Sequence, residues 1–256
     1  MLIFLGGLAL ADGAVTLLWQ EPISALIAKI HQGELSSDLA REEHAVPSAY
    51  ERQALAGLAT ERRRISFLAG DLERHAGNGS AVGRIVIPKI GASFVVVKGT
   101  DTGDLESGPG IYSETPFPGG GRTTLIAGHR TTFLAPFRHI DALVPGSKIQ
   151  LRMPYAHFTY TVIGHRIVQP QNVRAAVASF GYQRLVLSAC TPLFSAAKRL
   201  LVYARLTRTV PVGAARLLTG GVVAKPIESP IHKSPPRALP PVLESLDPQH
   251  VTPVAQ

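Results

Sequence analysis

The stretch RLVLSACTP (residues 184–192), followed by RLLVYARL (residues 199–206), decides the fold. Each begins with an apolar run of strand length, and Thr191-Pro192 ends the first run because proline has no N–H to donate to a sheet. Similar short runs bounded by Gly and Pro turns fill the chain between residues 84 and 207. The further runs are residues 84–87, 94–97, 123–127, 148–153 and 158–168.

Seven or eight strands close together in one segment predict an all-β domain, either a sandwich or a closed barrel. Between them, only residues 132–143 carry a helical pattern. The regular alternation of strands and helices that builds a parallel α/β sheet is therefore missing, and we do not expect that architecture.

The composition bounds the class of protein. The chain has 256 residues, of which 45% are hydrophobic and 17% charged, so it is long and apolar enough for a sizeable core. Its single cysteine, Cys190, excludes an intrachain disulfide and a Cys-rich metal site. The net charge of +8 suits nucleic acid, an anionic membrane or an acidic cell envelope. Because no aromatic-studded basic motif accompanies it, we do not expect nucleic acid as a partner.

The segments outside the strand-rich region predict three further parts. Residues 2–19 are apolar apart from Asp12 and Thr16, which predicts a transmembrane anchor over residues 1–20, with a secretory signal peptide as the alternative. Residues 21–79 have a helical pattern with one apolar face, which predicts an amphipathic stalk or, alternatively, a helix packed on the domain.

A glycine-rich break at residues 77–79 places the start of the all-β domain near residue 80, and we expect that domain to end near residue 210. Residues 211–256 contain nine of the 20 prolines. This composition predicts a flexible tail that acts as a spacer, the alternative being a Pro-rich ligand for an SH3-type domain.

Three residues at strand ends have the chemistry of a cysteine enzyme. Cys190 ends one predicted strand and Arg199 opens the next, so both side chains are expected at the same end of the sheet. A guanidinium there favours the thiolate and can hold an oxyanion. His129 follows the predicted strand 124–127, and a Cys–His pair supplies a nucleophile and a general acid. Taken singly, a lone cysteine is more often buried and inert, and an arginine more often a surface ion-pair partner.

The motifs TLIAGHR (residues 124–130), LSACTP (187–192) and RLLV (199–202), in this order, resemble the sortases, the cysteine transpeptidases of Gram-positive cell surfaces. GPGIY (108–112) and FRHID (137–141) also resemble segments that flank the catalytic histidine of that family. The resemblance covers residues 84–207 and is greatest to the actinobacterial class E branch, on the residues LLWQEP (17–22) and Tyr112. Val186 and Ala189 depart from the family pattern, which has threonine at both positions.

The resemblance implies a closed eight-stranded β-barrel with His129, Cys190 and Arg199 along one groove. It implies that Cys190 attacks the Thr–Gly bond of an LPXTG or LAXTG sorting signal, that His129 protonates the leaving amine, and that Arg199 stabilises the oxyanion. Tyr112 and Thr191 would contact the substrate. Neither a cofactor nor a metal is expected.

The partners implied are secreted proteins with a C-terminal sorting signal and an amine of the peptidoglycan. The resemblance also implies a single-pass protein of the cell membrane with its catalytic domain on the extracellular face. The alternatives are a specialised sortase of class D or C type and a catalytically silent barrel that binds envelope peptides. A papain-like protease is disfavoured, because its histidine would lie downstream of the cysteine.

Overall fold

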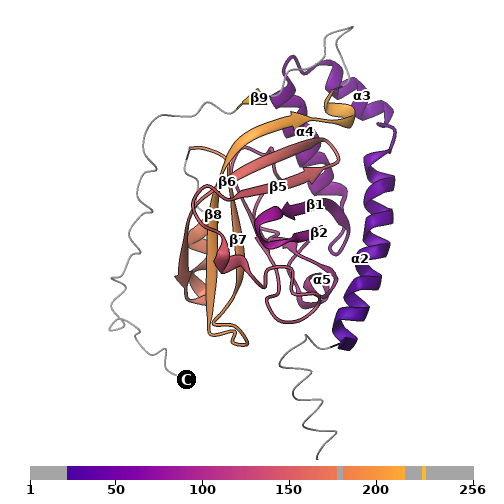
Figure 1. Ribbon diagram of the computed structural model, residues 1–256. Helices are drawn as coiled ribbons and strands as arrows, with labels where there is room; N and C mark the ends of the chain where they lie inside the picture. The colour runs from indigo at the N-terminus through magenta and orange to yellow at the C-terminus, as the bar shows by residue number, and fades with distance from the viewer. Residues whose placement is uncertain (1–21, 178–180, 217–226, 229–256) are drawn as a thin grey trace, which may run out of the picture.

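Eight strands close into a barrel in the computed structural model, which describes residues 22–177, 181–216 and 227–228 (Figure 1). They follow one another around the ring in the order β6-β5-β1-β2-β3-β4-β7-β8, and the pairing of β6 with β8 completes it. The predicted closed eight-stranded barrel is confirmed. The strands are β1 (Ala81–Ile87), β2 (Ala92–Lys98), β3 (Gly110–Ile111), β4 (Thr123–Ala127), β5 (Lys148–Met153), β6 (Ala156–Val168), β7 (Arg184–Thr191) and β8 (Lys198–Pro211).

Most neighbouring strands are antiparallel, but β2–β3 and β4–β7 are parallel pairs. Side chains alternate between the barrel interior and its outer surface, as β5 shows with buried Ile149, Leu151 and Met153 separated by less buried polar residues. The observed β4 and β5 coincide with predicted runs, and the other five predicted runs lie within longer strands.

Residues 132–143, which have a helical pattern in the sequence, form no α-helix. Phe133, Leu134 and Ala135 have positive φ angles of 50°, 62° and 43°, so the chain leaves the helical region at three consecutive residues. This path brings Phe137 into the core, where it is fully buried. Only a short 3-10 turn, η2 (Ile140–Ala142), follows. The other 3-10 turns are η1 (Pro88–Ile90), η3 (Pro170–Val177) and η4 (Gly213–Ala215).

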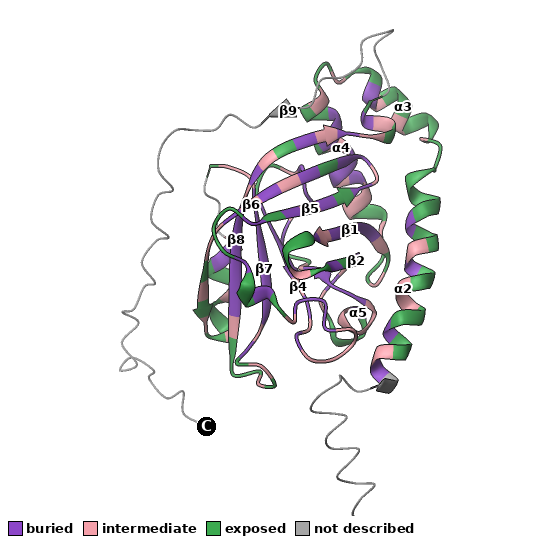
Figure 2. Ribbon diagram, in the orientation of Figure 1, coloured by how far each residue is buried: buried purple, intermediate pink, exposed green. Residues whose placement is uncertain are grey.

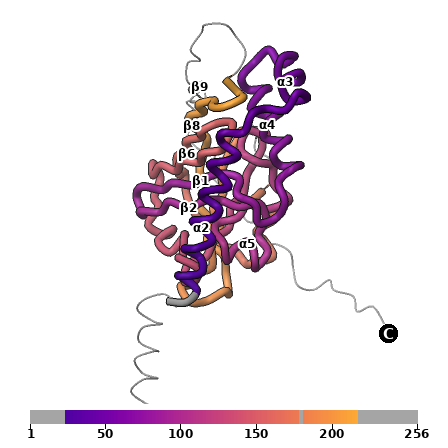
Figure 3. Tube along the Cα trace, turned by 90° about the vertical axis from the view of Figure 1, so that its right-hand side faces the viewer, coloured from indigo at the N-terminus to yellow at the C-terminus, as the bar shows by residue number. Residues whose placement is uncertain are grey.

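The region from residue 22 to residue 75 forms three helices, α2 (Pro22–Glu43), α3 (Ala49–Ala56) and α4 (Glu61–His75), and α2 runs along one side of the barrel (Figures 1 and 3). Leu35 and Leu39 of α2 belong to a buried cluster with residues of β2, and α4 contributes apolar side chains to the main core. The described part of the predicted stalk therefore packs on the barrel, which is the alternative that the sequence left open.

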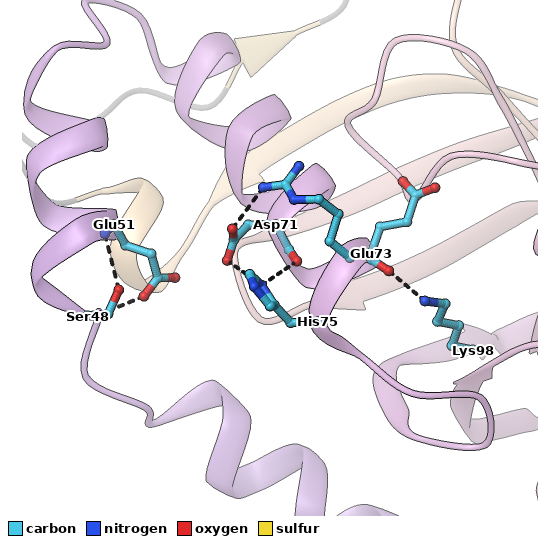
Figure 4. Close-up of polar contacts among 7 residues, drawn as sticks. Ser48, Glu51, Asp71, Glu73, His75 and Lys98 are labelled. Carbon is cyan, nitrogen blue, oxygen red and sulfur yellow. Dashed lines mark hydrogen bonds and ion pairs between the residues drawn. The ribbon is translucent and has the colours of Figure 1, made fainter.

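Polar contacts fix the C-terminal end of α4 (Figure 4). His75 Nδ1 lies 3.0 Å from the backbone oxygen of Asp71, and Lys98 Nζ donates to the backbone oxygens of Glu73 (2.6 Å) and Ala76 (2.8 Å). Because the last carbonyls of a helix have no partner within it, Lys98 satisfies two of them and ties α4 to β2. A further short helix, α5 (Thr102–Ser107), follows β2.

The two ends of the chain differ in how much of them is described. The predicted anchor over residues 1–20 lies outside the described residues, and within those described no helix is both long and apolar enough to cross a membrane. Residues 211–216 of the predicted tail are packed rather than separate, since Ala215 is buried and its oxygen accepts from Arg64 Nε at 3.0 Å. Farther along, β9 (Ile227–Glu228) pairs with β8.

Candidate active site

Alternation along β7 directs Cys190 to the outer face of the barrel wall. Leu187 and Ala189 belong to the interior core, whereas Val186 belongs to a second cluster outside the wall. Cys190 lies four residues beyond Val186 and therefore on the same outer face. Its side chain is half-buried, so the thiol is held by the strand and remains accessible. Figure 2 shows β7 as a largely buried strand within the wall.

Arg199 lies directly opposite Cys190 in the antiparallel β7–β8 pair. Residues that face one another in this way project from the same side of a sheet. The Arg199 guanidinium donates through Nη1 to the backbone oxygen of Ala196 (2.9 Å) in the connection between β7 and β8 and to that of Lys198 (3.2 Å), the first residue of β8. The arginine therefore lies on the same face of the sheet as Cys190, and its guanidinium is hydrogen-bonded to backbone oxygens close to it in the chain.

His129 reaches the same place through the parallel β4–β7 pair. Paired residues of these strands, such as Thr123 and Arg184, are 61 positions apart, and so are His129 and Cys190 (190 − 129). The Gly128 N–H extends the ladder by donating to Ser188 O at 3.1 Å. The register of the two strands therefore places His129 beside Cys190.

The imidazole of His129 is enclosed and has an unused nitrogen. Its Nε2 is buried without a hydrogen-bond partner among the described residues, and the Phe133 ring lies 5.2 Å away between centroids. Burial lowers the pKa of His129 below its ordinary value of 6.5, while the carboxylate of Glu106 at the end of α5 partly opposes this effect. The neutral imidazole is therefore favoured at pH 7.

The loop after His129 is held by close packing. The N–H of Phe137 donates to His129 O at 2.9 Å. A Cβ atom on Gly128 would come within 2.7 Å of the Phe137 ring, so only glycine allows this approach. The carbonyl of His129 and the ring beneath Gly128 together fix the backbone on both sides of the imidazole.

Arg130, which the sequence reasoning did not single out, connects the histidine loop to the nucleophile strand. It is only 6% exposed, and its Nη1 donates to Cys190 O at 3.4 Å. Its Nε and Nη2 both donate to Arg138 O at 3.2 Å, and Nη2 lies 3.0 Å from Asp141 Oδ1. The only sequence signal for this role is its position directly after His129, because nothing local reveals that the cation is buried.

The structure places the two predicted substrate-binding residues differently. Tyr112 packs against the outer cluster, on the face that also carries Cys190. Thr191 directly follows Cys190, so strand alternation directs it to the opposite face, where it is buried. The site thus brings together Cys190, His129 and Arg199, with Tyr112 on the same face and Thr191 on the other.

Residues 85–207 match the family described as the sortase domain. The chain carries a sortase domain. Its match to Sortase D of Bacillus subtilis (strain 168) is 32% identical over 130 residues, covering 50% of this chain and 64% of that relative. Sortase A of Streptococcus agalactiae serotype III (strain NEM316) is 26% identical over 167 residues, covering 63% and 65%. The chain therefore spans slightly less than two thirds of both curated relatives.

The solved structures agree on the fold of the sortase domain. Sortase C from Clostridium perfringens, determined with the C-terminal cell wall sorting motif, superimposes with a TM-score of 0.55 at 22% identity. That likeness covers 67% of this chain and 96% of the other. The likeness thus covers most of a solved sortase in fold, although few residues are shared.

Proposed function

We propose that this sortase-family protein is a cysteine transpeptidase that cuts a sorting signal of LAXTG or LPXTG type between Thr and Gly and transfers the new carboxyl end to an amine. The observation that carries the proposal is the convergence of Cys190, His129 and Arg199 on one outer face, fixed by the β4–β7 and β7–β8 registers. A thiol, an imidazole and a guanidinium in this arrangement supply a nucleophile, a proton carrier and an oxyanion donor.

In the acylation half, the Cys190 thiol gives its proton to His129, and the sulfur attacks the Thr carbonyl carbon. The carbonyl electrons move to oxygen, and the Arg199 guanidinium donates to that oxyanion. When the tetrahedral intermediate collapses, the C–N bond breaks and the His129 imidazolium protonates the leaving Gly nitrogen. Because burial lowers the pKa of His129, the imidazolium gives up this proton readily.

The second half resolves the thioacyl-enzyme. A neutral amine attacks the thioester carbon, and His129 takes the proton that the amine loses. The C–S bond then breaks, and the His129 imidazolium returns this proton to the departing Cys190 sulfur, which leaves as thiol. Arg199 has to exchange its bonds to two backbone carbonyls for the oxyanion. The exchange costs little, because the loop is exposed and water replaces the guanidinium at these carbonyls.

The substrate and its location form the finer part of the proposal. The motifs resemble class E sortases, which supports secreted proteins with a C-terminal sorting signal as substrates and a peptidoglycan amine as acceptor. The sorting motif in the Clostridium perfringens structure supports the same class of peptide. The apolar composition of residues 2–19 supports a membrane anchor with the catalytic domain on the extracellular face.

A class D-type sortase with another signal is the second candidate, and the similarity to the Bacillus subtilis relative favours it. One experiment tests both. The full chain is incubated with LAETG and LPETG peptides and an amine, and the products are followed by mass spectrometry. We expect cleavage after Thr with transfer to the amine, abolished in Cys190→Ala, and the preferred peptide identifies the branch. No thioacyl adduct with either peptide would contradict the proposal.

A further inference from the structure

The outward face of α2 changes character along its length. Ala28, Leu35 and Leu39 are buried against the barrel, as expected for the inner face of a surface helix. The outer face of the first turns carries Leu26 (60% exposed) and Ile30 (54% exposed). These positions would normally be polar. The later turns present acidic residues outward instead, namely Glu34, Asp38 and Glu42.

A second set of exposed apolar side chains lies where β7 passes into β8. Phe194, in the connection, is 58% exposed, and the Arg138 guanidinium lies over its ring at 5.8 Å. Ile167, 55% exposed, pairs with Leu200 at the start of β8 and so lies at the same end of the barrel. The exposed large hydrophobic residues of the described chain are thus concentrated at this end, because Leu26, Ile27 and Ile30 lie there too.

Two views agree on this placement. The β7–β8 connection and the first turns of α2 occupy the same lower end of the molecule in Figure 1 and again after the quarter turn in Figure 3. Cys190, at the end of β7, belongs to this end as well. The opposite end carries the junction of α2 and α3, where Val46 and Tyr50 are exposed.

The side chains at this end and the direction of the chain point to one kind of partner. Lys29 and Lys198 are exposed beside the apolar side chains of the active-site end, whereas the far half of α2 presents Glu34, Asp38 and Glu42, with Arg41 paired to Asp38. Apolar side chains interleaved with lysines suit an anionic lipid surface, which carboxylates would avoid. The chain also continues from α2 directly into the apolar residues 2–19.

We propose that this end, comprising Leu26, Ile27, Ile30, Ile167 and Phe194 with Lys29 and Lys198, docks on the surface of an anionic lipid bilayer. The barrel then lies with its active-site end against the membrane, and Cys190 meets substrates at the lipid surface. The far half of α2, with its acidic outer face, points away from the bilayer. The docking surface adds to the proposed anchor an orientation that an anchor alone does not fix.

Fluorescent labels on the full chain test the orientation directly. In a Cys190→Ser background, Ala197→Cys carries a label at the docking end and Ala45→Cys carries the same label at the opposite end. The protein is reconstituted into vesicles of phosphatidylglycerol and phosphatidylcholine that contain a nitroxide lipid. We expect strong quenching at residue 197 and little at residue 45. Equal quenching, or stronger quenching at residue 45, would overturn the proposal.

A pair of matched variants tests the residues. Leu26→Gln with Ile30→Gln should lower the ratio of docked to free domain at least about tenfold, because the burial of one aliphatic side chain alone is worth about that much. The control, Val46→Gln with Tyr50→Gln at the far end, should leave the quenching unchanged. A similar loss in the control would show that any apolar side chain suffices and would contradict a defined docking surface.

Two further readouts separate other outcomes. Vesicles of phosphatidylcholine alone should quench the label at residue 197 less, since the lysines lose their partners. Self-quenching between labels at residue 197 without quenching by lipid would show that a second copy covers this face, which would also overturn the proposal. Because the Cys190→Ser protein cannot form a thioacyl-enzyme, the result does not depend on the proposed transpeptidase activity.

Discussion

The loop that carries His129 and the connection that leads to Arg199 border the same thiol, but they are held in opposite ways. The histidine loop is tied by the buried Arg130, by Phe137 in the core and by the ring of Phe133. Within the described part of the chain, the Arg199 side chain donates only to the exposed backbone oxygens of Ala196 and Lys198. The comparison teaches that the protein itself fixes His129, whereas the Arg199 guanidinium is bound only to nearby exposed backbone and can turn without disturbing the core.

Removing the thiol on which both sides converge has the largest expected effect. Cys190→Ala should abolish transpeptidation, because Cys190 is the single thiol of the chain and a thioester needs a thiol. The thermal unfolding midpoint should hardly change, since the side chain is half-buried and small. Mass spectrometry of the peptide products and thermal unfolding measure the two effects. If turnover stayed near that of the wild type, Cys190 would not be the nucleophile, and the comparison of the two sides of the site would lose its basis.

The loosely held side is tested by Arg199→Ala. We expect a loss of about 10²- to 10³-fold in kcat, as for the removal of an oxyanion donor, with little loss of stability. Arg199→Lys should recover only part of the rate, because a lysine lacks the planar fork of donors. Steady-state kinetics and chemical denaturation check both statements. A large loss of stability would show that Arg199 is structural and that the contrast with Arg130 is false.

The tightly held side is tested by Arg130→Met. This variant leaves Cys190 O and Arg138 O without their donor, so unfolding should become easier by about 1–3 kcal/mol. Asp141→Asn is the matched control and should cost less, because the Asp141 side chain is 61% exposed. Urea unfolding provides the measurement. The contrast between the two sides fails if Arg130→Met is no more destabilising than Arg199→Ala.

The smallest effect is the titration of His129. Because burial lowers its folded pKa below 6.5, the unfolded chain binds the proton more tightly. The contribution of the neutral ring to stability is therefore complete above pH 6.5 and is lost as the pH falls below that value. Proton NMR on the Cys190→Ala protein should give a pKa below 6.5, and Phe133→Ala should raise it by admitting water. An unchanged or lower pKa in Phe133→Ala would show that this ring does not shield the imidazole.

The parts of the fold that could be predicted are those that leave a pattern in neighbouring residues of the sequence. Period-two runs such as residues 148–153 are visible because each residue reports its own face. The two-residue β3 has no period to detect, and residues 132–143 look helical because the sequence does not show the positive φ angles of Phe133, Leu134 and Ala135. The long strands predicted an all-β domain, the resemblance to sortases implied that it closes into a barrel, and neither predicted the path of the loops.

The residues of the candidate site also divide into those that a local sequence pattern reveals and those that it does not. Cys190, His129 and Arg199 were singled out by their positions at the ends of predicted strands together with the motifs that resemble sortases, and the strand registers bring them to one face. Arg130 and Glu106 act through burial and through contacts between distant elements, which no local pattern records. Thr191 illustrates the converse, since its nearness to Cys190 in the chain places it on the other face of β7.

The parallel pairing of β4 with β7 also has a consequence for how the protein folds. In the chain, β5 and β6 come between these partners, so His129 and Cys190 meet only when a loop of 61 residues closes. Loops of this length close late, and topologies rich in such contacts fold slowly. During refolding, activity should therefore return with the last kinetic phase, and a chain that has formed only its β5–β6 hairpin remains inert. The catalytic groups thereby report that the barrel has closed.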